Sequence, residues 1–164
     1  MNLIHTIFEP EGARPHPTLL TLHGRGANAL DLLSLAPYLC DGMFLVLCPQ
    51  GPLQVPLGGA GVGYGWFPIT MGGPLDLRAV MAAREELRTF LAEALQRYPI
   101  DSKKLAVLGF SQGGVMAYSL GFGEPERFAA LAVLSSWLPQ DLLSTLPDVP
   151  ATEQLPVVDP ARQP

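Results

Sequence analysis

The chain has 164 residues, of which 48% are hydrophobic and 15% charged, and its mean hydropathy is +0.26. This length fits one domain with a substantial core, and the composition argues against a disordered protein. A net charge of -5 without a basic cluster argues against nucleic-acid binding. No apolar run reaches the roughly 18 residues of a membrane helix, and residues 1–15 lack signal-peptide features, so we expect a cytoplasmic protein.

Apolar runs of strand length alternate with helical patterns along the chain. Runs that are apolar on both faces, as in buried parallel strands, lie at 18–23, 43–48, 104–110 and 128–135. Apolar residues spaced three and four apart predict helices over 27–39, 76–98 and 112–122. This alternation predicts a single α/β domain over residues 1–164, with a mostly parallel sheet and right-handed crossovers.

Two segments lack either pattern. Residues 49–74 are rich in Gly and Pro, and we expect a long loop that covers the functional site. Residues 140–164 predict a Pro-rich irregular tail in which 155–158 could begin another strand. Cys40 and Cys48 belong to no C-x-x-C motif or cluster of metal ligands, so we interpret them as buried free thiols.

One serine lies where a predicted strand meets a predicted helix, in the sequence Gly109-Phe110-Ser111-Gln112-Gly113. In such a turn the serine hydroxyl is exposed at the carboxyl end of the sheet, and glycines flank it because neighbouring backbone lies too close for a Cβ. The following helix directs free backbone N–H groups to the same place. The pattern favours a nucleophile at Ser111; the alternative is an ordinary helix N-cap.

A second strand-to-turn junction lies at Gly24-Arg25-Gly26-Ala27-Asn28. An oxyanion hole needs two donors, and we assign them to the backbone N–H groups of Arg25 and Gln112. With Ala29 the same residues also match the dinucleotide fingerprint G-x-G-x-x-A. No acidic residue follows the next predicted strand, so dinucleotide binding is a minor alternative.

Five blocks of sequence resemble the carboxylesterase/phospholipase family of α/β hydrolases, which includes the acyl-protein thioesterases. These blocks are LHGRGAN (22–28), CPQGP (48–52), WF (66–67), GFSQGG (109–114) and LSSWLP (134–139). The resemblance implies an α/β-hydrolase fold, no cofactor, and hydrolysis of carboxylic esters or thioesters, as in esterases, lysophospholipases and thioesterases. It also implies an acyl-enzyme at Ser111 and a structural role for His23. Many relatives have Leu where Arg25 stands. The implied acyl-pocket residues are Trp66, Phe67, Trp137 and Leu138.

The catalytic acid and base of that family are harder to place. They follow the nucleophile along the chain, yet no histidine follows Ser111, and Asp159 is the candidate acid. Relative to the family, the sequence lacks the last strands and helix. We therefore expect weak or absent activity and an exposed sheet edge at 128–135. The sequence could be an incomplete hydrolase, which we favour, one completed by a homodimer through 128–135, or a noncatalytic binding module.

Overall fold

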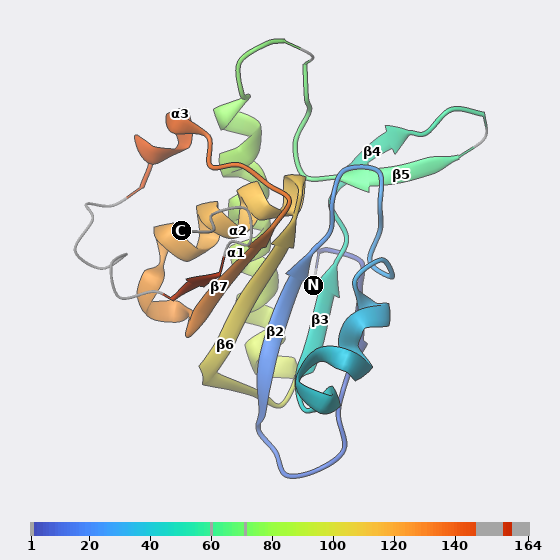
Figure 1. The fold of residues 1–164 in the computed structure, drawn as a ribbon, viewed down its shortest axis with the longest axis vertical. Helices are drawn as coiled ribbons and strands as arrows, with labels where there is room; N and C mark the ends of the chain where they lie inside the picture. Colours follow the sequence, from blue (N-terminus) through green and yellow to red (C-terminus); the bar gives the residue numbers. More distant parts are fainter. Residues whose placement is uncertain (1, 60, 71, 147–155, 159–164) are drawn as a thin grey trace.

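The computed structural model describes residues 2–59, 61–70, 72–146 and 156–158, and its centre is one six-stranded sheet (Figure 1). The spatial order is β1-β3-β2-β6-β7-β8. The strands are β1 (His5–Phe8), β2 (His16–Leu22), β3 (Leu45–Pro49), β6 (Ile100–Phe110), β7 (Ala130–Leu134) and β8 (Val157–Val158). Only β1 is antiparallel to its neighbour. The predicted mostly parallel α/β fold is confirmed, and β1 is an addition to the predicted strands.

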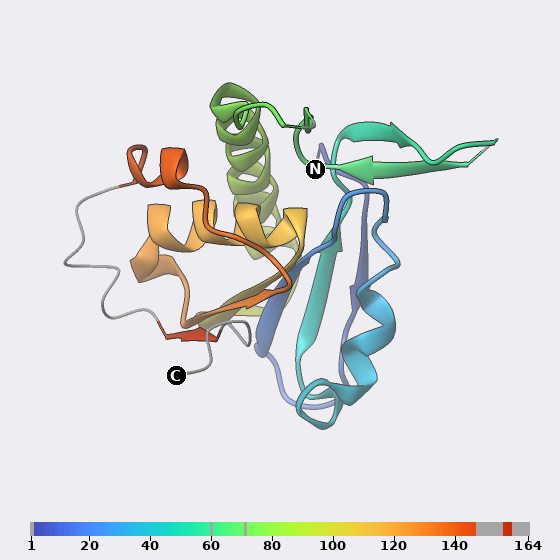
Figure 2. The same cartoon turned by 45° about the horizontal axis from the view of Figure 1, so that its top comes forward.

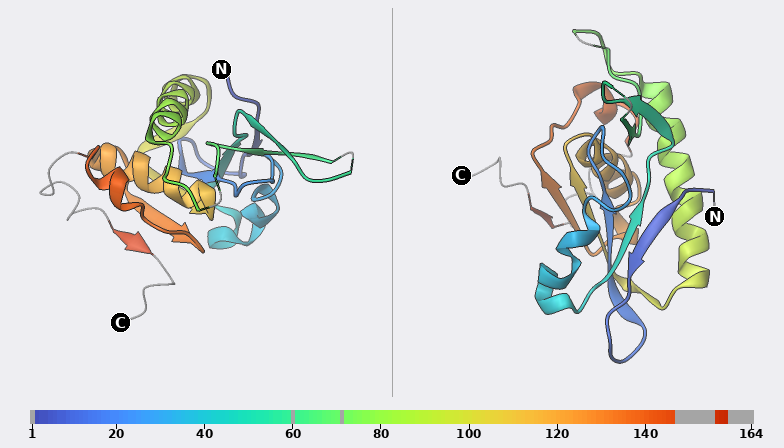
Figure 3. Two further views of the ribbon diagram at one scale, coloured as in Figure 1. Left: turned by 90° about the horizontal axis from the view of Figure 1, so that it is seen from above. Right: turned by 90° about the vertical axis from the view of Figure 1, so that its right-hand side faces the viewer.

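Helices cover both faces of this sheet, as the right-hand view of Figure 3 shows. Helices α1 (Leu77–Arg97) and α2 (Gln112–Gly123) pack on one face with the larger core cluster. The 3-10 segment η1 (Leu33–Gly42) packs on the other face. Helix α1 begins where the Asp76 carboxylate accepts a hydrogen bond from the Ala79 N–H, and it ends before Pro99. Both α-helices agree with their predicted ranges within a few residues.

The prediction of an α-helix over 27–39 is wrong. Residues 33–42 form a 3-10 helix instead, and the preceding residues are turns closed by bonds such as Asp31 N–H to the Asn28 carbonyl. Pro37 lies inside this segment and has no N–H to donate, and its ring disfavours the α conformation of the residue before it. The apolar spacing was therefore real, but the backbone could not complete α-helical bonding.

The prediction of a long loop over 49–74 is also wrong in part. It contains an antiparallel hairpin of β4 (Leu53–Pro56) and β5 (Val62–Gly65), which projects away from the sheet in Figures 1 and 2. Glycine allows this hairpin to lie against the backbone of the 24–27 turn, since a Cβ at Gly63 would be 2.0 Å from the Gly26 carbonyl oxygen. The hairpin packs beside the candidate site.

The edge of β7 is occupied in part. Strand β8 pairs with it in parallel, opposite Leu131 and Ala132, which confirms the strand predicted near 155–158. This pairing uses the edge that a homodimer would need, and the homodimer receives no support. The residues predicted as an irregular tail also include the short helix α3 (Gln140–Leu143). A short 3-10 turn, η2 (Pro125–Arg127), precedes β7. Among the described residues, no helix has the length and apolarity to span a membrane.

Candidate active site

Ser111 lies at a strained turn between β6 and α2. Its backbone angles, φ of 51° and ψ of -117°, lie in a region that residues other than glycine rarely adopt. Such a conformation costs about 1–3 kcal/mol. Its N–H donates to the Leu134 carbonyl at 2.9 Å, and its carbonyl accepts from the Ser136 hydroxyl at 2.6 Å. Within the described structure the Ser111 side chain makes no capping hydrogen bond, which argues against the N-cap alternative. The turn thus holds a half-buried hydroxyl that caps nothing.

Glycines flank this turn because there is no room for side chains. A Cβ at Gly109 would lie 2.2 Å from the carbonyl oxygen of Gly113, and a Cβ at Gly114 would lie 2.4 Å from the Cβ of Ser136. Real Cβ contacts are never this short, so both positions exclude alanine without movement of the backbone. The sequence pattern around Ser111 therefore has the physical cause that the motif implies.

The turn at 24–26 runs directly beside Ser111. A Cβ at Gly24 would lie 3.4 Å from the Ser111 Cβ, so the next residue, Arg25, begins at the same place. Among the described residues the Arg25 N–H has no acceptor. Gln112 is the first residue of α2, so its N–H has no partner within the helix. The structure thus places the turn that contains Arg25 beside Ser111, and Gln112 follows this serine directly along the chain.

The side chain of Gln112 has a role that the sequence analysis missed. It is fully buried, its Oε1 accepts from the Trp66 N–H at 2.9 Å, and its Nε2 donates to the Phe67 carbonyl at 2.7 Å. One amide thus satisfies two successive backbone groups and fixes the 66–67 segment to the start of α2. A polar residue of this length inside an otherwise apolar helix was the available signal.

His23 anchors the loops and is not placed to act as a base. Its Nε2 accepts from the Gly51 N–H at 2.9 Å, so its Nδ1 carries the proton and donates to the Gly24 carbonyl at 2.8 Å. Its ring lies 5.1 Å from that of Trp66, whose Nε1 donates to the His23 carbonyl. Burial lowers the pKa of His23 below its ordinary value. These contacts support the structural role that the resemblance implied.

The other two histidines have their partners away from Ser111. His5 bonds to the Leu3 carbonyl and to the Tyr98 hydroxyl. His16 pairs with Ile100 at the start of β6, ten residues of strand away from its carboxyl end. Asp159 lies outside the described residues. Among the side chains that the structure describes, we find no cluster of three or more His, Cys, Asp and Glu that could hold a metal.

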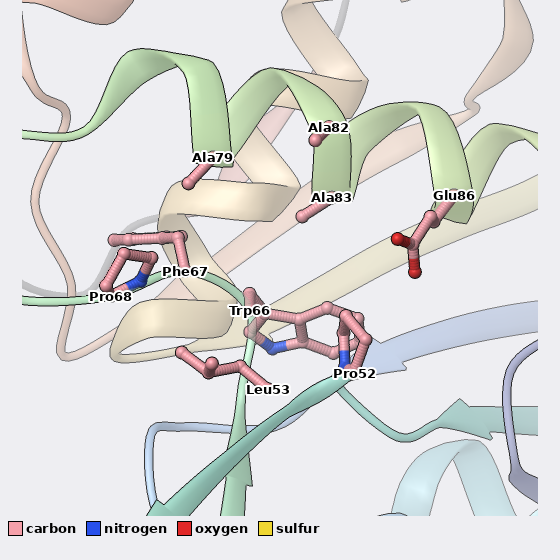
Figure 4. Close-up of a pocket in the computed structure, with 9 residues that line it drawn as sticks. All are labelled: Pro52, Leu53, Trp66, Phe67, Pro68, Ala79, Ala82, Ala83 and Glu86. Atoms are coloured by element: carbon pink, nitrogen blue, oxygen red, sulfur yellow. The ribbon is translucent and has the colours of Figure 1, made fainter.

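The predicted acyl-pocket residues have different environments. Phe67 is among the lining residues of two hollows, although only 1% of it is exposed. The larger, apolar hollow has a volume of about 260 Å³ and lies between α1, Pro52 and Leu53 (Figure 4). The smaller hollow, of about 120 Å³, is lined by Phe67 and by Trp137, which is 47% exposed.

Two of the predicted acyl-pocket residues belong more to the core. Trp66 forms a wall of the larger hollow, yet it is only 2% exposed and its indole is bonded to the backbone. Leu138 is partly buried and packs against the larger core cluster.

The structure does not support dinucleotide binding at the 24–29 glycine turn. The fingerprint requires an α-helix N-terminus directly after the glycine turn, but residues 27–32 are turns and a bridge to Tyr64. The Gly26 N–H donates to the Tyr64 carbonyl, so the hairpin covers this turn. Cys48, predicted as a buried thiol, is 3% exposed, accepts a bond from the Thr21 hydroxyl and has a pKa raised by burial. The side chain of Cys40 lies outside the described structure.

Several known proteins resemble this chain in sequence, in fold or in both. A chain from Mycosarcoma maydis described as acyl-protein thioesterase 1 is 30% identical in an alignment 146 residues long, which covers 78% of this chain and 60% of that protein. The carboxylesterase of Bacillus cereus superposes with a TM-score of 0.70 at 29% identity, over 85% of this chain and 62% of that one. Acyl-protein thioesterase 2 of Zea mays, at 24% identity and a TM-score of 0.68 over 94% and 73%, shares the fold.

These proteins are longer than the present chain, which spans about three fifths of the first two. The model of one protein family matches almost the whole sequence, from residue 4 to residue 158. Together with the hydrolase-type sheet and the glycine-flanked turn at Ser111, this match identifies the chain as a member of the phospholipase/carboxylesterase family of α/β hydrolases.

Proposed function

We propose that the protein is a carboxylic-ester hydrolase that forms an acyl-enzyme at Ser111. The observation that carries this proposal is the conformation of Ser111, a strained backbone that projects an uncapped hydroxyl beside a helix N-terminus. Such strain persists only where the surroundings enforce it, and it is concentrated at functional sites. The hydroxyl oxygen would attack the ester carbonyl carbon and lose its proton to solvent, and the carbonyl oxygen would become the oxyanion. Collapse of this intermediate would break the bond to the alcohol or thiol, which leaves with a proton, and water would then hydrolyse the acyl-enzyme and free Ser111.

The N–H groups of Arg25 and Gln112 are the proposed oxyanion donors. Both are main-chain groups whose positions are fixed by neighbours, the first by the Gly26 bond to Tyr64 and the second by the first turn of α2. Donors fixed in this way stabilise developing charge without reorganisation. The hollow lined by Phe67 and Trp137 is the proposed acyl site, since the strand end before Trp137 accepts the Ser111 N–H.

Activation of Ser111 is the weak step in this chain. None of its three histidines faces Ser111, so the proton of the hydroxyl has no imidazole acceptor here. In serine hydrolases that lack a triad member, the oxyanion hole and binding still give about 10³- to 10⁴-fold over water. We expect the 164-residue chain to hydrolyse esters at that residual level.

Labelling with a fluorophosphonate tests the proposal. The chain is incubated with the probe, and the modified residue is identified by peptide mass spectrometry. We expect slow modification of Ser111, abolished in Ser111→Ala and retained in Ser102→Ala, which removes an exposed serine of β6. Equal labelling of all three proteins, or none at Ser111 in the parent chain, would instead support a noncatalytic module on this scaffold.

A further inference from the structure

We propose that the Arg25 side chain binds a carboxylate carried by the acyl part of the substrate, which makes this residue a determinant of specificity for monoesters of short dicarboxylic acids. The inference rests on the proposed function, because it places the substrate carbonyl at Ser111. It concerns the guanidinium, whereas the oxyanion role belongs to the backbone N–H of the same residue.

The backbone on both sides of Arg25 is fixed beside the reacting centre. Gly24 approaches Ser111 so closely that a Cβ there would lie 3.4 Å from the serine Cβ. Gly26 donates its N–H to the Tyr64 carbonyl at 2.7 Å, and Tyr64 donates back to the Ala27 carbonyl at 2.8 Å. The side chain of Arg25 therefore starts at the proposed oxyanion hole. Its guanidinium can bind a substrate group that lies within the length of one arginine side chain from there.

The stem of Arg25 rests on β5. Its Cγ lies 3.7 Å from the position that a Cβ at Gly65 would take, so the absence of a side chain there leaves room for the stem. The residue as a whole is exposed, and among the described residues its guanidinium forms no hydrogen bond or ion pair. Its five donors are thus available to a ligand.

The segment beside Arg25 contains no acidic residue that would oppose an anion. The protein carries a net charge of -5, yet residues 49–74, which include the hairpin beside Arg25, contain no charged residue. The N-terminus of α2 at Gln112 adds the positive end of a helix dipole. A carboxylate near Ser111 would therefore meet one unpaired cation without a competing local acid in that segment.

Arginine suits a carboxylate better than lysine does. Its planar fork donates two parallel hydrogen bonds to the two carboxylate oxygens, whereas an ammonium acts as a point charge. Phosphate fits the same fork, and the experiment includes it as a separate ligand.

Equilibrium binding tests the proposal without relying on catalysis. The ¹⁵N-labelled chain is titrated with glutarate, with the uncharged glutaramide and with inorganic phosphate. NMR follows the Nε–H signal of Arg25 in the parent, and the backbone amide signals of residues 24–26 and 112 in the parent and in every variant. We expect saturable shifts with glutarate only, at least tenfold weaker binding in Arg25→Leu, and intermediate binding in Arg25→Lys. Arg78→Leu removes another exposed arginine, at the start of α1, and should bind as the parent does.

Unaltered glutarate binding in Arg25→Leu, equal loss in Arg78→Leu, or shifts with phosphate alone would overturn the assignment. A kinetic arm separates this inference from the proposed function. We compare kcat/KM for the 4-nitrophenyl monoester of glutaric acid with that for 4-nitrophenyl butyrate. Arg25→Leu should lower the ratio of the two values about tenfold. Hydrolysis that survives in Ser111→Ala would refute the proposed function, while the NMR result would still decide the role of Arg25.

Discussion

Gly113 passes so close to Leu22 that a Cβ on the glycine would lie 2.0 Å from the leucine carbonyl oxygen. The contact joins the first turn of α2 to the end of β2, just before the Gly24 turn. Gly113→Ala should lower the free energy of unfolding by at least about 3 kcal/mol, because backbone on two elements must move. Urea unfolding followed by circular dichroism measures this change.

The matched substitution is Gly61→Ala, in the β4–β5 hairpin. There the nearest heavy atom to the new Cβ would be 3.5 Å away, an ordinary contact. Its free energy of unfolding should stay within about 0.5 kcal/mol of the parent. Equal effects at the two positions would show that the crowding at Gly113 does not exist in solution.

The protein should be more stable with glycine at position 111 than with alanine there. The positive φ of 51° strains any residue with a Cβ, and glycine removes that strain at a smaller cost in chain entropy. We expect the free energy of unfolding, measured in urea, to be about 1 kcal/mol higher for Ser111→Gly than for Ser111→Ala. At Ser102, an exposed position of β6 without a positive φ, the order should reverse, with glycine the less stable.

Gln112→Ala should loosen the segment that carries Trp66. The substitution leaves the Trp66 N–H and the Phe67 carbonyl buried without partners, at a cost of about 2–3 kcal/mol in unfolding free energy. A red shift of tryptophan emission should accompany it as water reaches the ring. Gln96→Ala, on the exposed side of α1, is the control and should change neither quantity. An unshifted spectrum with parental stability in Gln112→Ala would contradict the bridging role.

Much of the fold could be predicted from the sequence, because the central strands and the two long helices carry the apolar residues that form the core in recognisable patterns. The runs at 18–23 and 104–110 match β2 and β6, and the spacing over 76–98 matches α1. Predictions failed where contacts across the fold decide the conformation. In the hairpin, Tyr64 of β5 bonds to the 24–27 turn in addition to the pairing of β5 with β4, and no local pattern shows this contact. The helix predicted over 27–39 failed for a local reason instead, because the range includes Pro37.

The site divides in the same way. The role of the glycines around Ser111 could be predicted from the sequence, because a tight turn leaves no room for Cβ atoms locally. The roles of Gln112 and Ser136 could not be predicted, since each depends on a partner at least 25 positions away along the chain. The structural role of His23 was predicted from the resemblance and from its place at the end of a strand, and the two bonds of its ring to backbone groups supply a physical reason for it.

Buried His23 should make folding sensitive to acid. Burial lowers its pKa in the folded protein below the ordinary value of 6.5, so the unfolded chain binds the proton more tightly. The contribution is fully present above pH 6.5, and it is lost as the pH falls toward the lowered pKa of the folded state. The slope for one proton is at most about 1.4 kcal/mol per pH unit.

Urea unfolding at several pH values between 8 and 4.5 measures this slope. His23→Gln cannot titrate, so it should be less stable than the parent at pH 8, where it lacks the two ring bonds, and should lose less stability on acidification. Gln96→Ala, which leaves every histidine in place, should keep the parental slope. If His23→Gln and the parent lose stability in parallel, the imidazole is not held neutral by burial and its anchoring bonds to Gly24 and Gly51 do not persist in solution.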